Sequence, residues 1–174
     1  FNVGDDVSVG RSKGGLVGRR GLTGAAFTAK VLGAASEKGD DVQKIAHLGR
    51  TMVKNFVTVG SSLDHCHVPG RSTDPKERGA LSQSAVEIGM GIHNEPGAKH
   101  IENKPSGEDL IKEMLELLLR EDDPERSFVK FNKDDDPVLI INNLGGMSSI
   151  ELGAIAAEAR TQIERDWNLR LSRV

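Results

Sequence analysis

The chain has 174 residues, a formal net charge of −3 and a single cysteine, Cys66. That length suits one domain of ordinary size, and one cysteine excludes a disulfide scaffold. The small negative charge disfavours a broad nucleic-acid-binding surface, and no apolar run approaches the roughly 18 residues of a membrane helix, so neither nucleic acid nor a membrane is an expected partner.

The first predicted segments are a short strand end over residues 1–9 and a glycine-rich basic loop over residues 10–21. The chain begins at Phe1 rather than methionine, and it ends at Val174 just as an apolar pattern resumes. Both ends therefore read like cuts through a longer chain. The first residues also lack the basic region and apolar run of a signal peptide, so we expect a cytoplasmic protein.

Two helices and a strand are predicted next. Apolar residues at helical spacing predict a helix over residues 23–38, with Thr23 as its N-cap and Gly39 as its stop. A second helix is expected from about residue 41 to residue 56. Residues 57–63 have the composition of a strand.

The middle of the chain contains a polar loop and then an alternating segment. Residues 84–93 alternate between apolar and small or polar side chains, which predicts a strand with one apolar face. The residues expected on that face are Val86, Ile88, Met90 and Ile92. Residues 94–97 (NEPG) form a predicted turn that ends this strand.

The last part of the chain interleaves helices and strands. The predicted elements are a helix that starts at Ser106, a short strand over residues 128–131, a buried strand over residues 138–141, and a helix from Ser148 or Ser149 to about Trp167. Ser106 and Asp109 fit a capping box. Strands that alternate with helices indicate the α/β class.

His93 is the first candidate functional residue, because it ends a predicted strand where a turn begins. Ligands of α/β folds bind at strand ends. An imidazole can act as a nucleophile, a general base or a metal ligand near neutral pH. The alternative is a histidine that only hydrogen-bonds the backbone of the turn, and position alone leaves both open.

His65, Cys66 and His67 form a second candidate. Alternate residues of an extended chain point the same way, so the two histidines could share a face and bind zinc with the thiol. No second Cys/His pair stands at ligand spacing, and His93 and His100 are the nearest alternatives. We therefore expect a structural loop whose folding does not depend on zinc.

Two loops are the remaining candidates. Residues 10–21 (GRSKGGLVGRRG) precede a helix and could hold an anion on backbone N–H groups, although the spacing is not that of a P-loop. Loop packing, with arginines paired to acidic residues, is the alternative. Residues 138–149 (VLIINNLGGMSS) look like a ligand-side loop, but Asn142 and Asn143 could equally satisfy backbone groups. The acidic run at residues 134–136 is expected to be a solvated turn.

Five segments together resemble one family. They are VGDDVSV (3–9), GGLVGRRGLTG (14–24), VGSSLDHCHVPGR (59–71), IGMGIHNEPG (88–97) and VLIINNLGGMSS (138–149). In this order they look like the dihydroxyacetone (glycerone) kinase family, most closely its ATP-dependent fungal type. The resemblance covers nearly the whole chain and implies that family's layered sheet-and-helix α/β kinase domain, incomplete at both ends.

The resemblance implies a role for His93. In this family a histidine in a G-[IL]-H-x-E-x-G stretch attacks the ketone carbon of dihydroxyacetone and forms a hemiaminal, and His93 occupies that position here. Covalent addition selects a carbonyl compound over glycerol and fixes a hydroxyl group for phosphoryl transfer. The expected ligand is dihydroxyacetone or glyceraldehyde.

Other parts of that family's kinase do not occur in this sequence. Its G-G-G-S-G-H-E-P and N-Y-[ST]-G-D stretches would lie before Phe1, and its ATP-binding helical domain, whose aspartates hold magnesium, would lie after Val174. The resemblance therefore implies the end of a first lobe (residues 1–62) and a truncated lobe that carries His93 (residues 63–174). ATP and magnesium would bind outside this chain.

Three functions remain to be separated. The expected one is ATP-dependent phosphorylation of dihydroxyacetone by the complete polypeptide, which would form a homodimer as its relatives commonly do, while the chain alone would be inactive. The second is a non-catalytic triose-binding or regulatory module that acts through a partner protein. In the third, the glycines and histidines serve only packing and an oligomer interface.

Overall fold

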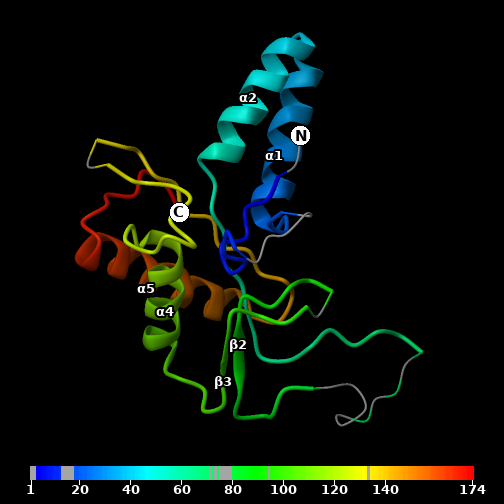
Figure 1. Cartoon of the computed structure of the whole chain (residues 1–174), viewed down its shortest axis with the longest axis vertical. Coiled ribbons are helices and arrows are strands. Elements are labelled where there is room, and N and C mark those ends of the chain that lie inside the picture. The colour runs from blue at the N-terminus through cyan, green and yellow to red at the C-terminus, as the bar shows by residue number, and fades with distance from the viewer. Residues whose placement is uncertain are drawn as a thin grey trace.

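The computed structural model describes residues 3–12, 18–70, 72, 74, 80–93, 95–132 and 134–174. The described chain combines helices with a small sheet, in agreement with the predicted α/β class (Figure 1). The elements are α1 (Thr23–Glu37), α2 (Val42–Lys54), β1 (Ser61–Ser62), β2 (Val86–Ile88), β3 (Lys99–Ile101), α4 (Gly107–Leu119) and α5 (Ser149–Asp166). None of the described helices is long and apolar enough to cross a membrane.

β2 is the central strand of a three-stranded sheet with the order β1–β2–β3. It is antiparallel to both neighbours, so that Ser61 pairs with Ile88 and Val86 pairs with Ile101. All three residues of β2 are buried. The end of this buried strand is therefore a well-supported point from which a functional loop can start.

The N-terminal segment runs parallel to the chain that enters the sheet. Asp6 and Thr58 form a parallel bridge. The Val7 N–H donates to the Thr58 carbonyl at 2.9 Å, and the Thr58 N–H donates to the Asp5 carbonyl at 2.8 Å. This pairing fixes the Asp5–Asp6 pair between the sheet and the start of α1.

Two hydrophobic clusters share helix α4. The first contains Ile111, Leu115, Ala159 and Ile163, and the second contains Val7, Val59 and Ile88. Apolar side chains of α4, among them Leu110 and Met114, pack against the second cluster. Helix α4 therefore joins α5 to the sheet, whereas α1 and α2 form a hairpin that projects away from this core (Figure 1).

Local signals for the helix ends are confirmed at several positions. Ser106 caps α4, and Ser148 caps α5 in a capping box with Glu151. Asp41 caps α2 by accepting hydrogen bonds from two backbone N–H groups. Gly39, with a φ of +83°, follows the end of α1 as predicted.

The predicted N-cap of α1 is wrong. Thr23 is the first helical residue, and Leu22 at the cap position has no capping side chain. Instead, the carboxylate of Asp5 accepts hydrogen bonds from the N–H groups of Leu22 and Gly24, both at 2.8 Å. Because the capping group comes from a distant segment, no local pattern identifies it.

Two predicted strands are shorter than expected. Residues 57–63 give only β1 and the bridge at Thr58. In residues 84–93 the strand ends at Ile88, because Gly89 has a left-handed φ of +82° that breaks the alternation. Ile92 consequently leaves the apolar face and is 53% exposed. The turn lies at residues 92 and 93 instead of 94–97, and Asn94 lies outside the described residues.

The strands predicted in the last third are wrong. Residues 128–131 form no strand, and the Phe128 ring packs against the side chains of Arg11 and Arg19. Residues 138–141 form one parallel bridge, from Val138 to Arg173, and Val138 is 56% exposed rather than buried. Conversely, β3 was not predicted, since its three residues show no apolar alternation.

Candidate active site at the His93 loop

His93 lies in the loop that joins β2 to β3. The loop is closed at its base, where the Ala98 N–H donates to the Ile88 carbonyl at 2.9 Å and the Gly97 N–H donates to Oε1 of Glu87. A Cβ built on Gly97 would lie 2.8 Å from that Oε1, so the contact requires glycine. Both ends of the loop are thus held by the sheet.

The ring of His93 is hydrogen-bonded on one side and 78% exposed. Its Nδ1 lies 3.0 Å from Oε1 of Glu95, and its backbone N–H donates to Oε2 of the same carboxylate at 3.0 Å. A carboxylate beside Nδ1 favours the tautomer with the proton there, so we assign the proton to Nδ1 and the lone pair to Nε2. An unprotonated Nε2 is what a nucleophilic histidine needs.

The carboxyl group of Glu95 is held in its charged form. Partial burial raises its pKa, but hydrogen bonds from its own backbone N–H and from the ring and backbone N–H of His93 together outweigh that effect. The net result is a pKa below the ordinary range of a glutamate. Glu95 is therefore an anion at neutral pH and can stabilise positive charge on the adjacent ring.

A small pocket of about 200 Å³ opens beside His93. It is lined by Arg20, Gly21, Leu22, Ile92, His93 and Glu95. Pockets for drug-sized ligands measure roughly 300–1,000 Å³, so this one suits a much smaller molecule. A larger hollow of about 520 Å³ between α4 and α5 shares none of these residues.

Arg20 reaches the pocket from the loop that precedes α1. Its Nε donates to Oδ2 of Asp6 at 2.7 Å, and its Nη2 donates to the Ser8 hydroxyl at 2.7 Å and to the Gly89 carbonyl at 2.6 Å. Asp6 is completely buried. Arg20 therefore connects the N-terminal segment to the first residue of the His93 loop.

The other described arginines of the predicted anion-binding loop stack on an aromatic ring. The guanidinium carbons of Arg19 and Arg11 lie 3.6 Å and 4.2 Å from the centroid of Phe128, and burial lowers the pKa of Arg19. The expected pairing with an acidic residue is confirmed at Arg20. Residues 13–17 lie outside the described residues, so anion binding by this loop stays a prediction.

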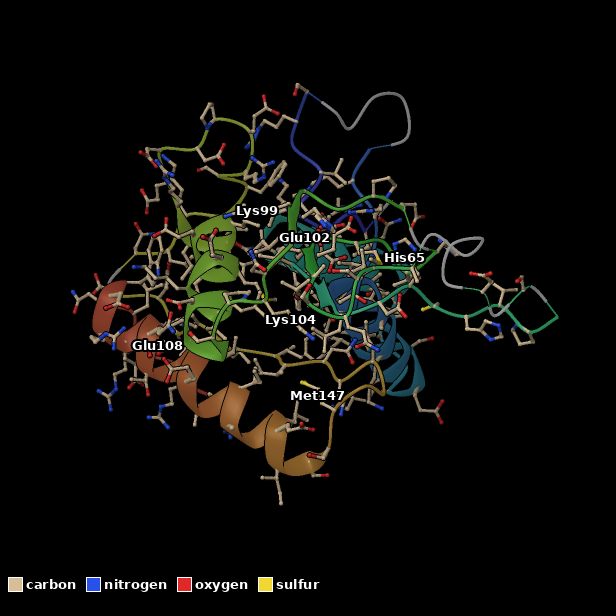
Figure 2. All side chains as sticks on the ribbon, turned by 90° about the horizontal axis from the view of Figure 1, so that it is seen from below. His65, Lys99, Glu102, Lys104, Glu108 and Met147 are labelled. Carbon is tan, nitrogen blue, oxygen red and sulfur yellow. The ribbon has the colours of Figure 1, made fainter. Side chains whose placement is uncertain are left out.

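The histidine–cysteine triplet lies apart from the pocket. Figure 2 shows His65 on the long loop after β1, on the side of the molecule away from α4 and α5, and Cys66 and His67 are exposed. None of the three lines the pocket beside His93. In the part of the chain that the structure describes, no group of three or more His, Cys, Asp or Glu side chains could hold a metal ion.

Asn143 satisfies backbone groups of its own loop. Its Oδ1 accepts hydrogen bonds from the N–H groups of Gly145 and Met147 at 2.8 Å and 3.3 Å, and its Nδ2 donates to the Met147 carbonyl at 2.7 Å. The structural alternative is therefore confirmed for this residue. The acidic run forms an exposed turn in which Asp135 accepts a hydrogen bond from the Asn132 N–H at 2.7 Å.

Sequence reasoning assigned neither Glu95 nor Arg20 a place in the pocket beside His93. For Glu95 the signal was available, because a glutamate two residues after a histidine at the start of a turn can fold back onto its ring. For Arg20 there was none, since this side chain reaches the pocket only through contacts with Asp6 and Gly89 that form in the folded state.

The fold and the pocket together define an α/β domain with an accessible histidine at the exit of a central strand. The Dak1 domain family matches this chain over residues 1–174. The chain therefore belongs to the Dak1 domain family, in agreement with the resemblance found in the sequence.

Three curated relatives illustrate the similarity. The chain is 45% identical over 171 residues to dihydroxyacetone kinase 1 of Saccharomyces cerevisiae, 41% over 182 residues to a dihydroxyacetone kinase of Pichia angusta, and 36% over 154 residues to triokinase/FMN cyclase of Homo sapiens. These alignments cover 96%, 99% and 88% of this chain, but 29%, 30% and 25% of the relatives. The chain thus spans less than a third of their length.

Two solved structures share the fold. The native dihydroxyacetone kinase of C. freundii gives a TM-score of 0.72 at 25% identity, with 92% of this chain and 27% of that chain covered. The same enzyme in complex with AMP-PNP and Mg²⁺ gives 0.71 at 24% identity, with 95% and 28% covered. The fold expected from the resemblance is confirmed.

Proposed function

We propose that this chain is the triose-binding part of an ATP-dependent dihydroxyacetone kinase and that His93 holds the substrate as a covalent hemiaminal. One observation carries the proposal: an exposed imidazole, with Nδ1 bonded to Glu95, lies at the edge of a pocket sized for a small molecule. The names of the relatives, dihydroxyacetone kinase and triokinase, support the substrate class.

The addition step balances with the groups present. The Nε2 lone pair of His93 forms a bond to the carbonyl carbon, and the π electrons move to the oxygen, which takes up a proton from water. The ring then loses its Nδ1 proton to Glu95, which returns a proton to water, so the net change is addition of N–H across C=O. The anionic carboxylate favours this step because it stabilises the positive charge that develops on the ring.

Covalent capture gives the selectivity that a small pocket cannot obtain from contacts alone. Glycerol has the hydroxyl groups of dihydroxyacetone but no carbonyl, so His93 distinguishes the two by reactivity rather than by fit. Glyceraldehyde, also a carbonyl triose, would be captured in the same way. The bond also fixes the terminal hydroxyl in position for phosphoryl transfer.

In this proposal the nucleotide and magnesium bind to other parts of the polypeptide. The C. freundii enzyme has been solved with AMP-PNP and Mg²⁺. Among the residues that the structure describes, no group of three or more His, Cys, Asp or Glu side chains fits a metal ion, and the steps proposed above use none. Phosphoryl transfer depends on positioning and charge neutralisation, so we expect this chain by itself to bind triose without using ATP. The lobe boundary at residue 62, the homodimer and the cytoplasmic location stay predictions.

The test is adduct formation by the protein expressed at its natural length. Native mass spectrometry with dihydroxyacetone should show a species heavier by one triose, and His93→Ala should abolish both this species and kinase activity. His100→Ala is the matched control, because this ring also lies 3.0 Å from a glutamate two residues later but does not line the pocket. His65→Ala and His67→Ala should also have little effect.

Three outcomes decide between the functions. No adduct in the unchanged protein, or equal losses in all the histidine variants, would contradict the assignment and favour the structural role. An adduct that forms without any phosphoryl transfer would favour the non-catalytic triose-binding module. An adduct that depends on His93 and accompanies phosphorylation supports the kinase.

A further inference from the structure

We propose that Arg20 donates a hydrogen bond to the oxygen that receives the electron pair when His93 adds to the substrate carbonyl. This inference rests on the proposed hemiaminal and assigns a second catalytic residue to its formation. It concerns a side chain from a segment more than seventy positions earlier in the chain, which the fold brings to the same pocket.

One nitrogen of the Arg20 guanidinium is left for the pocket. Nε and Nη2 already donate to the three partners described above, whereas Nη1 makes no hydrogen bond to another described residue. A Cβ built on Gly91 would lie 2.6 Å from Nη1 and would also contact the Glu95 carboxylate. Nη1 therefore faces the His93 loop at the lining of the pocket.

The lining supplies few other donors. Three of the lining residues, Gly21, Leu22 and Ile92, have no polar side-chain group and therefore no side-chain donor. Glu95 is an anion and can only accept, and the ring of His93 is occupied by Glu95 on one nitrogen and reacts with the other. A carbonyl oxygen that gains negative charge needs a donor, and a guanidinium gives a strong charge-assisted hydrogen bond.

The anchor of Arg20 holds this donor in place before the substrate arrives. Asp6 is completely buried and the side chain of Arg20 is 21% exposed, so the ion pair is largely shielded from water. The Gly89 carbonyl fixes the guanidinium to the turn from which the His93 loop starts. A donor that is already oriented needs little reorganisation when charge develops. A lysine carries its three N–H donors on one nitrogen, so it lacks the planar fork that reaches the anchor and the pocket from separate nitrogens.

The experiment compares Arg20→Lys with Arg19→Lys in the protein at its natural length. Arg20→Lys keeps a positive charge beside Asp6 but removes Nη1, the nitrogen that we propose donates to the substrate oxygen. We expect the apparent dissociation constant of the dihydroxyacetone adduct to rise roughly ten- to a hundredfold and kcat to fall by on the order of 10²-fold. Arg19 stacks on Phe128 and does not line the pocket, so its replacement should leave both quantities unchanged.

A spectrum of the His93 ring distinguishes donation from mere positioning of the loop. The ¹⁵N NMR signals of the imidazole should show the same Nδ1-protonated tautomer in Arg20→Lys as in the unchanged protein, because Glu95 still binds Nδ1. A weaker adduct with an unchanged ring supports the proposal. Two results would overturn the role of Arg20 but not the proposed hemiaminal. One is an adduct as strong as in the unchanged protein, and the other is a weaker adduct together with a changed tautomer of the His93 ring.

A second variant covers a loss of folding. If Arg20→Lys lowers the melting temperature strongly, the double variant Asp6→Asn, Arg20→Gln replaces it, because it removes both charges of the buried pair together. This double variant should weaken the dihydroxyacetone adduct to the same extent. Full adduct strength in this double variant would again overturn the role of Arg20. Absence of any adduct in the unchanged protein would instead contradict the proposed function itself.

Discussion

His93 and Glu95 contact each other twice, through the ring Nδ1 at 3.0 Å and through the backbone N–H of His93 at 3.0 Å. A pair with the same spacing occurs at His100 and Glu102, but there the ring uses Nε2, at 3.0 Å from Oε2. The first pair uses Nδ1 and leaves Nε2 of a pocket-lining ring available, whereas the second pair uses Nε2. The same spacing thus engages opposite ring nitrogens in the β2–β3 loop and in β3.

Replacement of Glu95 by glutamine should weaken the triose adduct without unfolding the protein. The amide has the shape of the carboxylate but no charge to stabilise the ring when Nε2 forms its bond. Hydrogen bonds to charged groups contribute about 1.5–3 kcal/mol, so we expect a roughly ten- to hundredfold rise in the apparent dissociation constant of dihydroxyacetone. Native mass spectrometry over a series of triose concentrations measures it.

Glu102→Gln is the control for that experiment. It changes the same kind of pair at the same spacing, but neither His100 nor Glu102 lines the pocket. Adduct formation should therefore match that of the unchanged protein. If both glutamine variants bind triose equally well, the Glu95 carboxylate has no role in activating His93.

The contact between His93 and Glu95 should persist in acid below the ordinary pKa of a glutamate. Because hydrogen bonds from His93 and the backbone hold the pKa of Glu95 down in the folded protein, the stabilisation that it provides is fully present above about 4.3, the unfolded value. It is lost as the pH falls through the lower folded value. The amide proton shift of His93, followed by NMR, should report a midpoint below about 4.3.

Removal of the ring provides the comparison for this titration. His93→Ala deletes one of the hydrogen bonds that lower the pKa of Glu95, so the midpoint measured at the amide of residue 93 should move up toward the ordinary glutamate value. A midpoint at or above that value in the unchanged protein would contradict the geometry of the contact.

Parts of the fold that depend on neighbours in sequence could be predicted, and parts that depend on distant residues could not. Ser106 and Ser148 cap their helices from three residues away, so the signal is local. The cap of α1 is Asp5, which reaches Leu22 across a loop, whereas the predicted cap, Thr23, is itself the first helical residue. Apolar runs such as residues 138–141 show only that a strand is possible, since pairing requires a partner strand.

The site follows the same division. His93 stands out because it lies where an alternating segment ends, and this position is visible in the sequence. The pocket needs a second wall, formed by Arg20 and Leu22, and these residues come from the loop before α1. The parallel bridge of Asp6 with Thr58, together with the hydrogen bonds from Arg20 to Asp6 and Gly89, brings that loop to the exit of β2. No periodicity in the sequence encodes such a contact.

A methyl group on Gly91 should disconnect the His93–Glu95 pair. A Cβ built there would overlap the Glu95 carboxylate and lie 2.6 Å from Nη1 of Arg20, so both side chains would have to move. Gly91→Ala should therefore reduce adduct formation at least tenfold, by the loss of one charge-assisted hydrogen bond. The His93 ring should lose its preference for the Nδ1-protonated tautomer in ¹⁵N NMR spectra.

Gly60 offers a matched substitution. It also lies next to the sheet, where its carbonyl accepts a hydrogen bond from the Gly89 N–H at 2.7 Å, but a Cβ built on it meets no atom within 4 Å. Gly60→Ala should thus preserve triose binding. If Gly91→Ala binds as well as Gly60→Ala, the close approach of Glu95 to residue 91 is not needed for the site.

Replacement of Asp5 by alanine should destabilise the start of α1 more than loss of an ordinary cap. Asp5 is 1% exposed, and its two oxygens accept the N–H groups of Leu22 and Gly24 at 2.8 Å, so alanine would leave one partly buried and one buried donor without this acceptor. Each such group costs about 1–3 kcal/mol, and we expect a total loss of roughly 2–4 kcal/mol. Asp41→Ala, at the exposed cap of α2, should cost only about 1 kcal/mol.

Thermal unfolding and amide hydrogen exchange together measure this difference. Asp5→Ala should lower the melting temperature more than Asp41→Ala, and it should speed exchange at the amides of Leu22 and Gly24. Because Arg20 lies two residues before Leu22, the loosened helix start should also weaken triose binding, whereas Asp41→Ala should not. Unchanged exchange at these two amides in Asp5→Ala would show that water satisfies them, and that the long-range cap does not hold the wall of the pocket in place.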